Sequence, residues 1–170
     1  MLNEYNSSAT VENCIFDGNT AAASGGAACT QNTSLTEFLN CTSVNNSAPL
    51  GGALYSSGAS ATNLSTCILW NNADEAIGSH DTSITTISYS DVQEGFPGEG
   101  NMSVDPRFVD GDTGDFRLQW GSPCIDKATS IGAPVSDVLG VSRPQGDGVD
   151  MGAYEFLLID EDGDGMDDRW

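Results

Sequence analysis

Short apolar runs alternate with polar turns through the first half of the chain, and one unit recurs. Runs at 11–16, 38–43 and 64–69 are bounded by Asn, Gly, Ser and Asp, and each aligns on a cysteine. These cysteines are 27 and 26 residues apart, at Cys14, Cys41 and Cys67. A fourth, imperfect copy at 86–92 carries Ser90 in place of the cysteine, after a step of 23 residues. The copies are rich in Val, Ile, Thr, Phe and Leu, which predicts strand followed by turn.

Polar and glycine positions repeat with the same period. An asparagine follows each cysteine by five positions, and Gly-Gly-Ala at 25–27 returns as Gly-Gly-Ala at 51–53. A near-constant period indicates a repeat architecture, and no copy holds ten residues with the apolar spacing of a helix. One copy cannot bury its apolar face alone, so successive strands should stack at about 4.8 Å. The sequence therefore predicts an all-β fold, a parallel β-solenoid.

Stacking suggests roles for the recurring residues. Asparagine tolerates the left-handed backbone of a tight corner, and its amide can bond to the equivalent amide one coil away. We therefore expect an asparagine ladder made by Asn19, Asn46 and Asn72. The three cysteines should form an interior row of small apolar groups. Neighbouring coils also bring them within the Cα range of a disulfide, but a reduced, buried stack is the favoured interpretation because free cysteine is so often buried.

The period is lost in a loop rich in Gly and Pro at 94–101. Beyond it, short apolar pieces separated by turns predict an irregular cap over the open end of the solenoid. The expected buried anchors are Phe108, Phe116, Leu118, Ile125, Met151 and Tyr154. The chain thus divides into coils at 1–93, a terminal coil and capping region at 94–155, and an acidic tail at 156–170. Because the chain opens almost directly inside a repeat, we expect upstream coils and a secretion signal in a longer protein.

Five ordered strings in the capping region carry a resemblance. They are DPRFVD at 105–110, GDFRLQ at 114–119, SPCID at 122–126, RPQG at 143–146 and VDMGAYE at 149–155. With the cysteine-bearing coils, they resemble the choice-of-anchor Q domain proteins over residues 8–155. The resemblance implies a secreted bacterial right-handed parallel β-helix of the pectate-lyase-like superfamily. It implies fold and surface location, and no reaction.

Acidic residues in these strings have two interpretations. Asp105, Asp126 and Asp150, with Arg143, form a candidate calcium or catalytic cluster. The favoured alternative is structural: carboxylates that accept turn amides and pair with the guanidinium.

The last eleven residues have the order of ligands of an EF-hand loop. Oxygens fall at positions one, three, five, seven and nine, with Gly165 at six; the candidate calcium ligands are Asp160, Asp162, Asp164, the Met166 carbonyl and Asp168. The segment also resembles a thrombospondin type 3 repeat. Its twelfth position would follow Trp170, so the loop is incomplete. A solvated acidic tail is the alternative.

The net charge of the chain limits the classes of partner that it can bind. The chain has 25 acids against five Lys and Arg, a formal charge of −20, and its first basic residue is Arg107. Coils without Lys or Arg cannot replace counterions on a phosphate backbone, which excludes nucleic acid and disfavours anionic membranes. A single histidine, His80, and no Cys-x-x-Cys leave a zinc site without ligands. A composition heavy in Ser, Thr, Asn, Gly and Asp suits an extracellular or bacterial cell-surface protein.

Three functions are compatible with this sequence. The first is a non-catalytic extracellular β-helix that binds glycan or adheres, with Trp70 and Tyr89 as candidate stacking residues. The second is a polysaccharide lyase or glycoside hydrolase, but the coils lack a basic residue for a lyase. The acids available for a hydrolase are Asp17, Asp74, Glu75, Asp81, Asp91 and Glu94. The third is a passive spacer. Fold alone does not decide between them, and catalysis is the less favoured interpretation.

Overall fold

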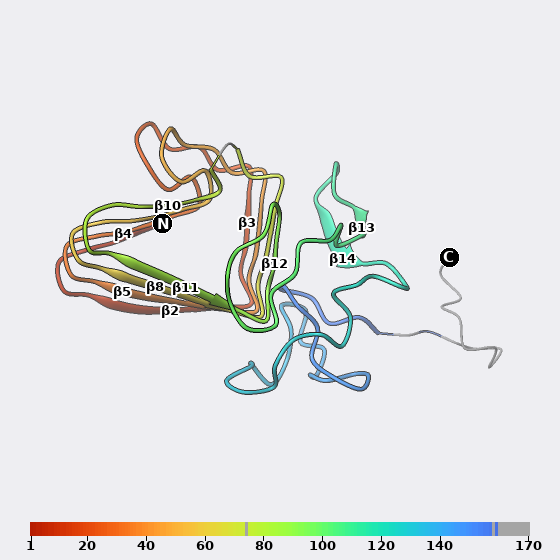
Figure 1. The fold of residues 1–170 in the computed structure, drawn as a ribbon. Helices are drawn as coiled ribbons and strands as arrows, with labels where there is room; N and C mark the ends of the chain where they lie inside the picture. The colour runs from red at the N-terminus through yellow and green to blue at the C-terminus, as the bar shows by residue number, and fades with distance from the viewer. Residues whose placement is uncertain (74, 158, 160–170) are drawn as a thin grey trace.

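The computed structural model describes residues 1–73, 75–157 and 159. The described residues up to 93 form a solenoid of four stacked coils. Each coil contributes one short strand to each of three parallel sheets, here named A, B and C (Figure 1). Sheet A contains β1 Leu2–Asn3, β4 Ala28–Thr30, β7 Leu54–Ser56 and β10 Ile77–Ser79. Sheet B contains β2 Ser8–Glu12, β5 Leu35–Leu39, β8 Ala61–Ser65 and β11 Ile84–Ser88. Sheet C contains β3 Ile15–Asp17, β6 Thr42–Val44, β9 Ile68–Trp70 and β12 Asp91–Val92.

The register between coils reproduces the sequence period. In sheet C, Ile15 pairs with Thr42, Thr42 with Ile68, and Ile68 with Asp91. These steps of 27, 26 and 23 residues equal the spacings of the three cysteines and Ser90. The predicted parallel β-solenoid is therefore confirmed.

Each apolar run that the sequence predicts as one strand belongs to two strands, because the chain turns a corner inside the run. The residue before each cysteine position has a left-handed backbone: Asn13 (φ 51°), Asn40 (φ 49°), Thr66 (φ 59°) and Tyr89 (φ 48°). This residue turns the chain from sheet B to sheet C, so the cysteine lies at the corner and not within a strand. Asparagine tolerates this conformation well, whereas β-branched and bulky residues adopt it rarely.

The asparagine ladder is present at the next corner. The Asn46 side-chain oxygen accepts hydrogen bonds from the backbone and side-chain amides of Asn19 at 3.0 and 2.9 Å. The backbone and side-chain amides of Asn46 donate to the Asn72 side-chain oxygen at the same two distances. The left-handed residues here are Gly18, Asn45 and Asn71, one position before each ladder residue. The ladder asparagines therefore form hydrogen bonds between coils at this corner. The left-handed backbone that we had expected of them belongs to the residue before each one.

The cysteine stack is also present, and all five cysteines are free thiols. The Cys41 thiol donates to the carbonyls of Leu39 and Val11, each at 3.4 Å, and Cys67 repeats this arrangement one coil on. A hydrogen bond with Cys67 and burial raise the pKa of the Cys41 thiol. Ser90 continues the row, because its hydroxyl donates to the Ser88 carbonyl at 2.8 Å.

Close backbone packing explains the repeated Gly-Gly-Ala. A Cβ on Gly26 would lie 2.2 Å from the Gly52 carbonyl oxygen, and one on Gly52 would lie 2.1 Å from the Ala73 carbonyl oxygen. The preceding glycines, Gly25 and Gly51, have φ near +60°. Only glycine fits both demands.

The interior combines an apolar core with a hydroxyl row. Strand β5 alternates, so Thr36 and Phe38 point inward, and the residues paired with Phe38 are Val11 and Leu64. The buried Thr36 hydroxyl bonds the Thr30 hydroxyl at 2.7 Å, and Ser56 bonds Thr62 at the same distance one coil away. Pairing satisfies these groups without water.

The region after the coils packs against the outer face of sheet C (Figure 1). It includes an antiparallel hairpin of β13 Phe108–Asp110 and β14 Asp115–Leu118, followed by irregular segments. A second core forms between sheet C and this region; its buried members are Ile68, Leu118, Cys124 and Met151. We had expected the anchors of this region to cover the open end of the solenoid. They pack against the side of the solenoid instead. Phe116, Leu118 and Met151 are buried, and Phe108, Ile125 and Tyr154 are half-buried.

The end of the last coil is covered instead by the loop at 94–101. Phe96 packs against the solenoid core. Met102 extends sheet C by accepting a hydrogen bond from Val92 and donating one to Ser90, both at 2.9 Å. The Asn101 side chain accepts from the Ser90 amide and donates to the Ile87 carbonyl. This segment begins a fifth, incomplete coil.

Candidate functional site

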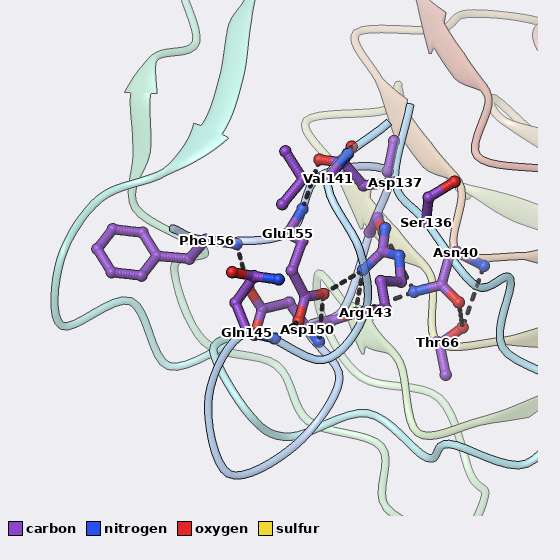
Figure 2. A network of polar contacts seen from close by, with 12 residues as sticks. Asn40, Thr66, Ser136, Asp137, Val141, Arg143, Gln145, Asp150, Glu155 and Phe156 are labelled. Carbon is purple, nitrogen blue, oxygen red and sulfur yellow. Dashed lines mark hydrogen bonds and ion pairs between the residues drawn. The ribbon is translucent and has the colours of Figure 1, made fainter. Parts of the chain in front are cut away.

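Arg143 lies at the centre of a buried polar network in the C-terminal region (Figure 2). Its guanidinium donates to the Glu155 carboxylate at 2.6 Å, and these side chains are only 1% and 0% exposed. It also donates to the Gly152 carbonyl at 2.9 Å and to the Asp150 carbonyl at 3.3 Å. Glu155 in turn accepts from the backbone amides of Gln145 and Asp150. Burying a charge is costly unless the charge is paired and hydrogen-bonded, and these contacts meet both conditions.

The aspartates that we grouped with Arg143 accept backbone amides. Asp105 accepts from Arg107, Asp126 from Gly148, and Asp150 from Asp126 and Phe156. Arg143 pairs with Glu155 and not with these carboxylates. Burial, with smaller contributions from Glu155 and Asp126, raises the pKa of Asp150 to about 7. The structural interpretation is therefore the one these contacts support.

The same network attaches this region to one corner of the solenoid. The Asn13 side chain donates to the Ser136 carbonyl at 2.7 Å, and the Asn40 side chain donates to the Asp150 carbonyl at 2.9 Å. The Gly152 amide donates to the Thr66 carbonyl at 2.7 Å. These contacts touch three successive coils. The strings around 143–146 and 149–155 thus supply docking contacts, which sequence reasoning could not place.

Asp91 fixes the fourth coil to the same region. It is fully buried, and its carboxylate accepts from the Val104 amide at 3.1 Å and from the Cys124 thiol at 3.4 Å. Burial raises the pKa of Asp91 to about 6, and burial together with Asp91 raises the pKa of the Cys124 thiol. Asp91 is therefore a structural group, inaccessible to a polymeric substrate.

Of the remaining candidate acids, Asp17 and Asp81 lie apart, and two glutamates share one cleft. Asp17 accepts from the Asn45 side chain at 3.0 Å, and Asp81 contacts His80 and the Gly58 amide. Glu75 and Glu94 line one cleft of about 590 Å³ at the last coil. Asp74 lies outside the described residues.

A second cleft, the hairpin cleft, lies between the outer corner of sheet C and the β13–β14 hairpin. Its volume is about 460 Å³, within the usual range of ligand sites. Trp70 and Asn71 line it from the solenoid. The lining residues from the hairpin side include Asp105, Arg107, Asp110, Asp112 and Gln119.

Trp70 is half-buried, because its side chain packs against the second core and also lines the hairpin cleft. The charged side chains that line the cleft are exposed. Arg107 donates to the Gly121 carbonyl at 3.2 Å, Asp110 accepts from the Thr113 amide at 3.3 Å, and the Gln119 amide donates to the Phe108 carbonyl at 3.1 Å. A cleft that offers part of an indole beside hydrogen-bonding groups suits a ligand with one apolar and one polar side.

Tyr89, the other candidate stacking residue, is occupied by the chain itself. Its hydroxyl donates to the Glu99 carboxylate at 2.8 Å. Its ring lies against Gly100, where a Cβ would come within 2.5 Å of it. Sequence reasoning found Trp70 but not the cleft residues on the hairpin side, which lie at least 35 positions further along the chain.

The candidate calcium ligands Asp160, Asp162, Asp164, Met166 and Asp168 lie outside the described residues. Within the described ranges, no group of three or more His, Cys, Asp or Glu is placed to hold a metal ion. The described part of the chain also contains no helix long and apolar enough to cross a membrane.

Comparison with known proteins gives one family match. The model of the Chlamydia polymorphic membrane protein repeat matches residues 13–31. This stretch contains Cys14, Asn19 and the first Gly-Gly-Ala, and it spans β3 and β4. Neither the curated proteins nor the solved structures contain a match to the chain. The repeat match and the stacked sheets agree on a parallel β-helix repeat protein.

Proposed function

We propose that this chain is a non-catalytic β-helix module of a bacterial cell surface and that it binds glycan in the hairpin cleft. The location is supported by the likeness of residues 13–31 to a repeat of a Chlamydia polymorphic membrane protein. It is also supported by the resemblance to secreted choice-of-anchor Q proteins and by coils that lack Lys and Arg up to Arg107.

The observation that carries glycan binding is the position of Trp70. Trp70 lines a solvent-accessible cleft together with Arg107, Asp110 and Asp112. The apolar face of a pyranose can stack on an indole, while its hydroxyls bond to charged and amide groups at the ring edge. Packing against the second core holds the Trp70 ring in place without ligand, which lowers the entropic cost of binding.

Polysaccharide hydrolysis is the second candidate, because Glu75 and Glu94 line one cleft. Two carboxylates on either side of a glycosidic bond are the minimal requirement of most glycosidases. The passive spacer is the third candidate, and it predicts that neither cleft has a ligand.

One experiment separates these functions. The protein is incubated with a panel of neutral and acidic polysaccharides in calcium, and pull-down and new reducing ends are both recorded. We expect pull-down without new ends, and loss of binding in Trp70→Ala. The matched control is Trp120→Ala, since Trp120 is 51% exposed and lies outside the hairpin cleft.

New reducing ends that disappear in Glu75→Gln or Glu94→Gln would replace the proposal with a hydrolase. Absence of both binding and cleavage across the panel would leave a spacer.

A further inference from the structure

The hairpin cleft carries an excess of negative charge. Asp105, Asp110 and Asp112 line it together with one cation, Arg107. We propose that the glycan bound there is an amino sugar with a free ammonium group, whose ring stacks on Trp70. This inference rests on the proposed function and adds the chemical class of its ligand.

Among the described residues, the carboxylates of the cleft form no ion pair. Ion pairs among the described residues join His80 to Asp81, Arg117 to Asp115 and Arg143 to Glu155. None of these includes an acid of the hairpin cleft, and Arg107 donates to a carbonyl. A ligand ammonium would therefore meet carboxylates without a charged partner, and charge-assisted hydrogen bonds are stronger than neutral ones.

Two other ligand classes fit less well. A uronic acid would add a negative charge beside three carboxylates, and such juxtaposition is costly. A metal ion needs several ligands converging on one point, and the described residues hold no such group of three or more. An ammonium group needs only one or two carboxylates, and the sugar ring stacks on Trp70. The acids alone would not define a site; Trp70 and the cleft do.

The test is isothermal titration of the full chain in about 150 mM salt, where charges further apart than about 8 Å are largely screened. The probes are a glucosamine tetramer, the N-acetylglucosamine tetramer and a galacturonate trimer. We expect the glucosamine tetramer to bind about tenfold more tightly than its N-acetylated counterpart, as one charge-assisted contact supplies. The galacturonate trimer should not bind.

Variants locate the effect. Asp110→Asn with Asp112→Asn should abolish the preference for glucosamine while retaining binding of the N-acetylated tetramer. The matched control, Glu12→Gln with Glu37→Gln, removes two charges from sheet B and should leave the preference unchanged. Circular dichroism of each variant checks that the fold is retained.

Equal affinity for the two tetramers in the unmodified chain would overturn the inference and leave the proposed function standing. Loss of the preference in the control variant would overturn it too, because attraction to the overall charge of −20 would then explain it. Absence of binding by any of the three probes and by the polysaccharide panel would remove the proposed function itself.

Discussion

Replacing the central residue of the asparagine ladder tests the physical basis of the repeat. Asn46 is fully buried, and its side chain links three coils. Its oxygen accepts from Asn19, and its amide donates to the Asn72 side chain, to the Phe16 carbonyl at 2.8 Å and to the Val44 carbonyl at 3.0 Å. In Asn46→Leu each of these partners loses a hydrogen bond, and water cannot replace it at the buried Val44.

The magnitude follows from the number of partners left unsatisfied. Each buried polar group without a partner costs about 1–3 kcal/mol. Asn19 is exposed and can bond to water, so one or two interior polar groups are left without a hydrogen-bond partner. We expect Asn46→Leu to lower the free energy of unfolding by about 2–5 kcal/mol.

The assay is urea unfolding followed by far-ultraviolet circular dichroism. Asn63→Leu is the matched control, because Asn63 points outward from β8, where its side chain accepts a hydrogen bond from Thr86 at 2.7 Å. The control should change the free energy of unfolding by about 0.5 kcal/mol or less. Equal effects of the two substitutions would refute the ladder as a stabilising device.

Further outcomes concern the buried acids, the docking contacts, the thiols and the tail. Burial raises the pKa of Asp91 to about 6 and of Asp150 to about 7, above their ordinary 3.8. The folded chain then binds more protons than the unfolded chain between about pH 4 and 7, so stability should fall as pH rises through that window. Ionisation of each buried group lowers the free energy of unfolding by up to about 3–4 kcal/mol. Urea midpoints should therefore be higher at pH 5 than at pH 7.5, and Asp150→Asn should make this pH dependence flatter. A midpoint that rises with pH would contradict this prediction. Gly152→Ala should cost about 1–3 kcal/mol, because Gly152 has φ +88° and a Cβ there would lie 2.8 Å from the Ile68 and Thr42 side chains; an unchanged melting temperature would show that the docking is looser than described. Cys41 should resist iodoacetamide until urea is added, as mass spectrometry can follow; rapid labelling of the native protein would argue against a buried stack. We also expect the acidic tail to bind calcium weakly in calorimetry and to lose this binding in Asp162→Asn; heat that is unchanged by the substitution would place any calcium elsewhere.

The coils could be predicted from the sequence because repeated residues have repeated environments. The spacing of Cys14, Cys41 and Cys67 equals the strand register, and Asn46 has the ladder contacts that its recurrence suggested. The corners between sheets B and C could not be predicted, because Thr66 and Tyr89 have a left-handed backbone that their residue types rarely adopt.

The C-terminal region could not be placed from the sequence, since its contacts do not repeat. Gly152 and Asp150 reach coils that lie more than 80 positions away in the chain. Local patterns identify such residues as turn formers and cannot say which face of the solenoid they contact. The hairpin cleft was missed for the same reason, because docking is what brings Arg107 and Asp112 to the cleft that Trp70 lines.

Sugar binding at Trp70 is the central claim, and tryptophan side-chain NMR tests it most directly. The chain has three tryptophans, so a ¹⁵N-labelled sample gives three indole signals, assigned with Trp70→Phe and Trp120→Phe. On titration with a polysaccharide fragment that is captured in pull-down, the Trp70 signal should shift in a saturable manner while the Trp120 signal stays in place. Saturable binding that leaves the Trp70 signal unmoved would contradict the account.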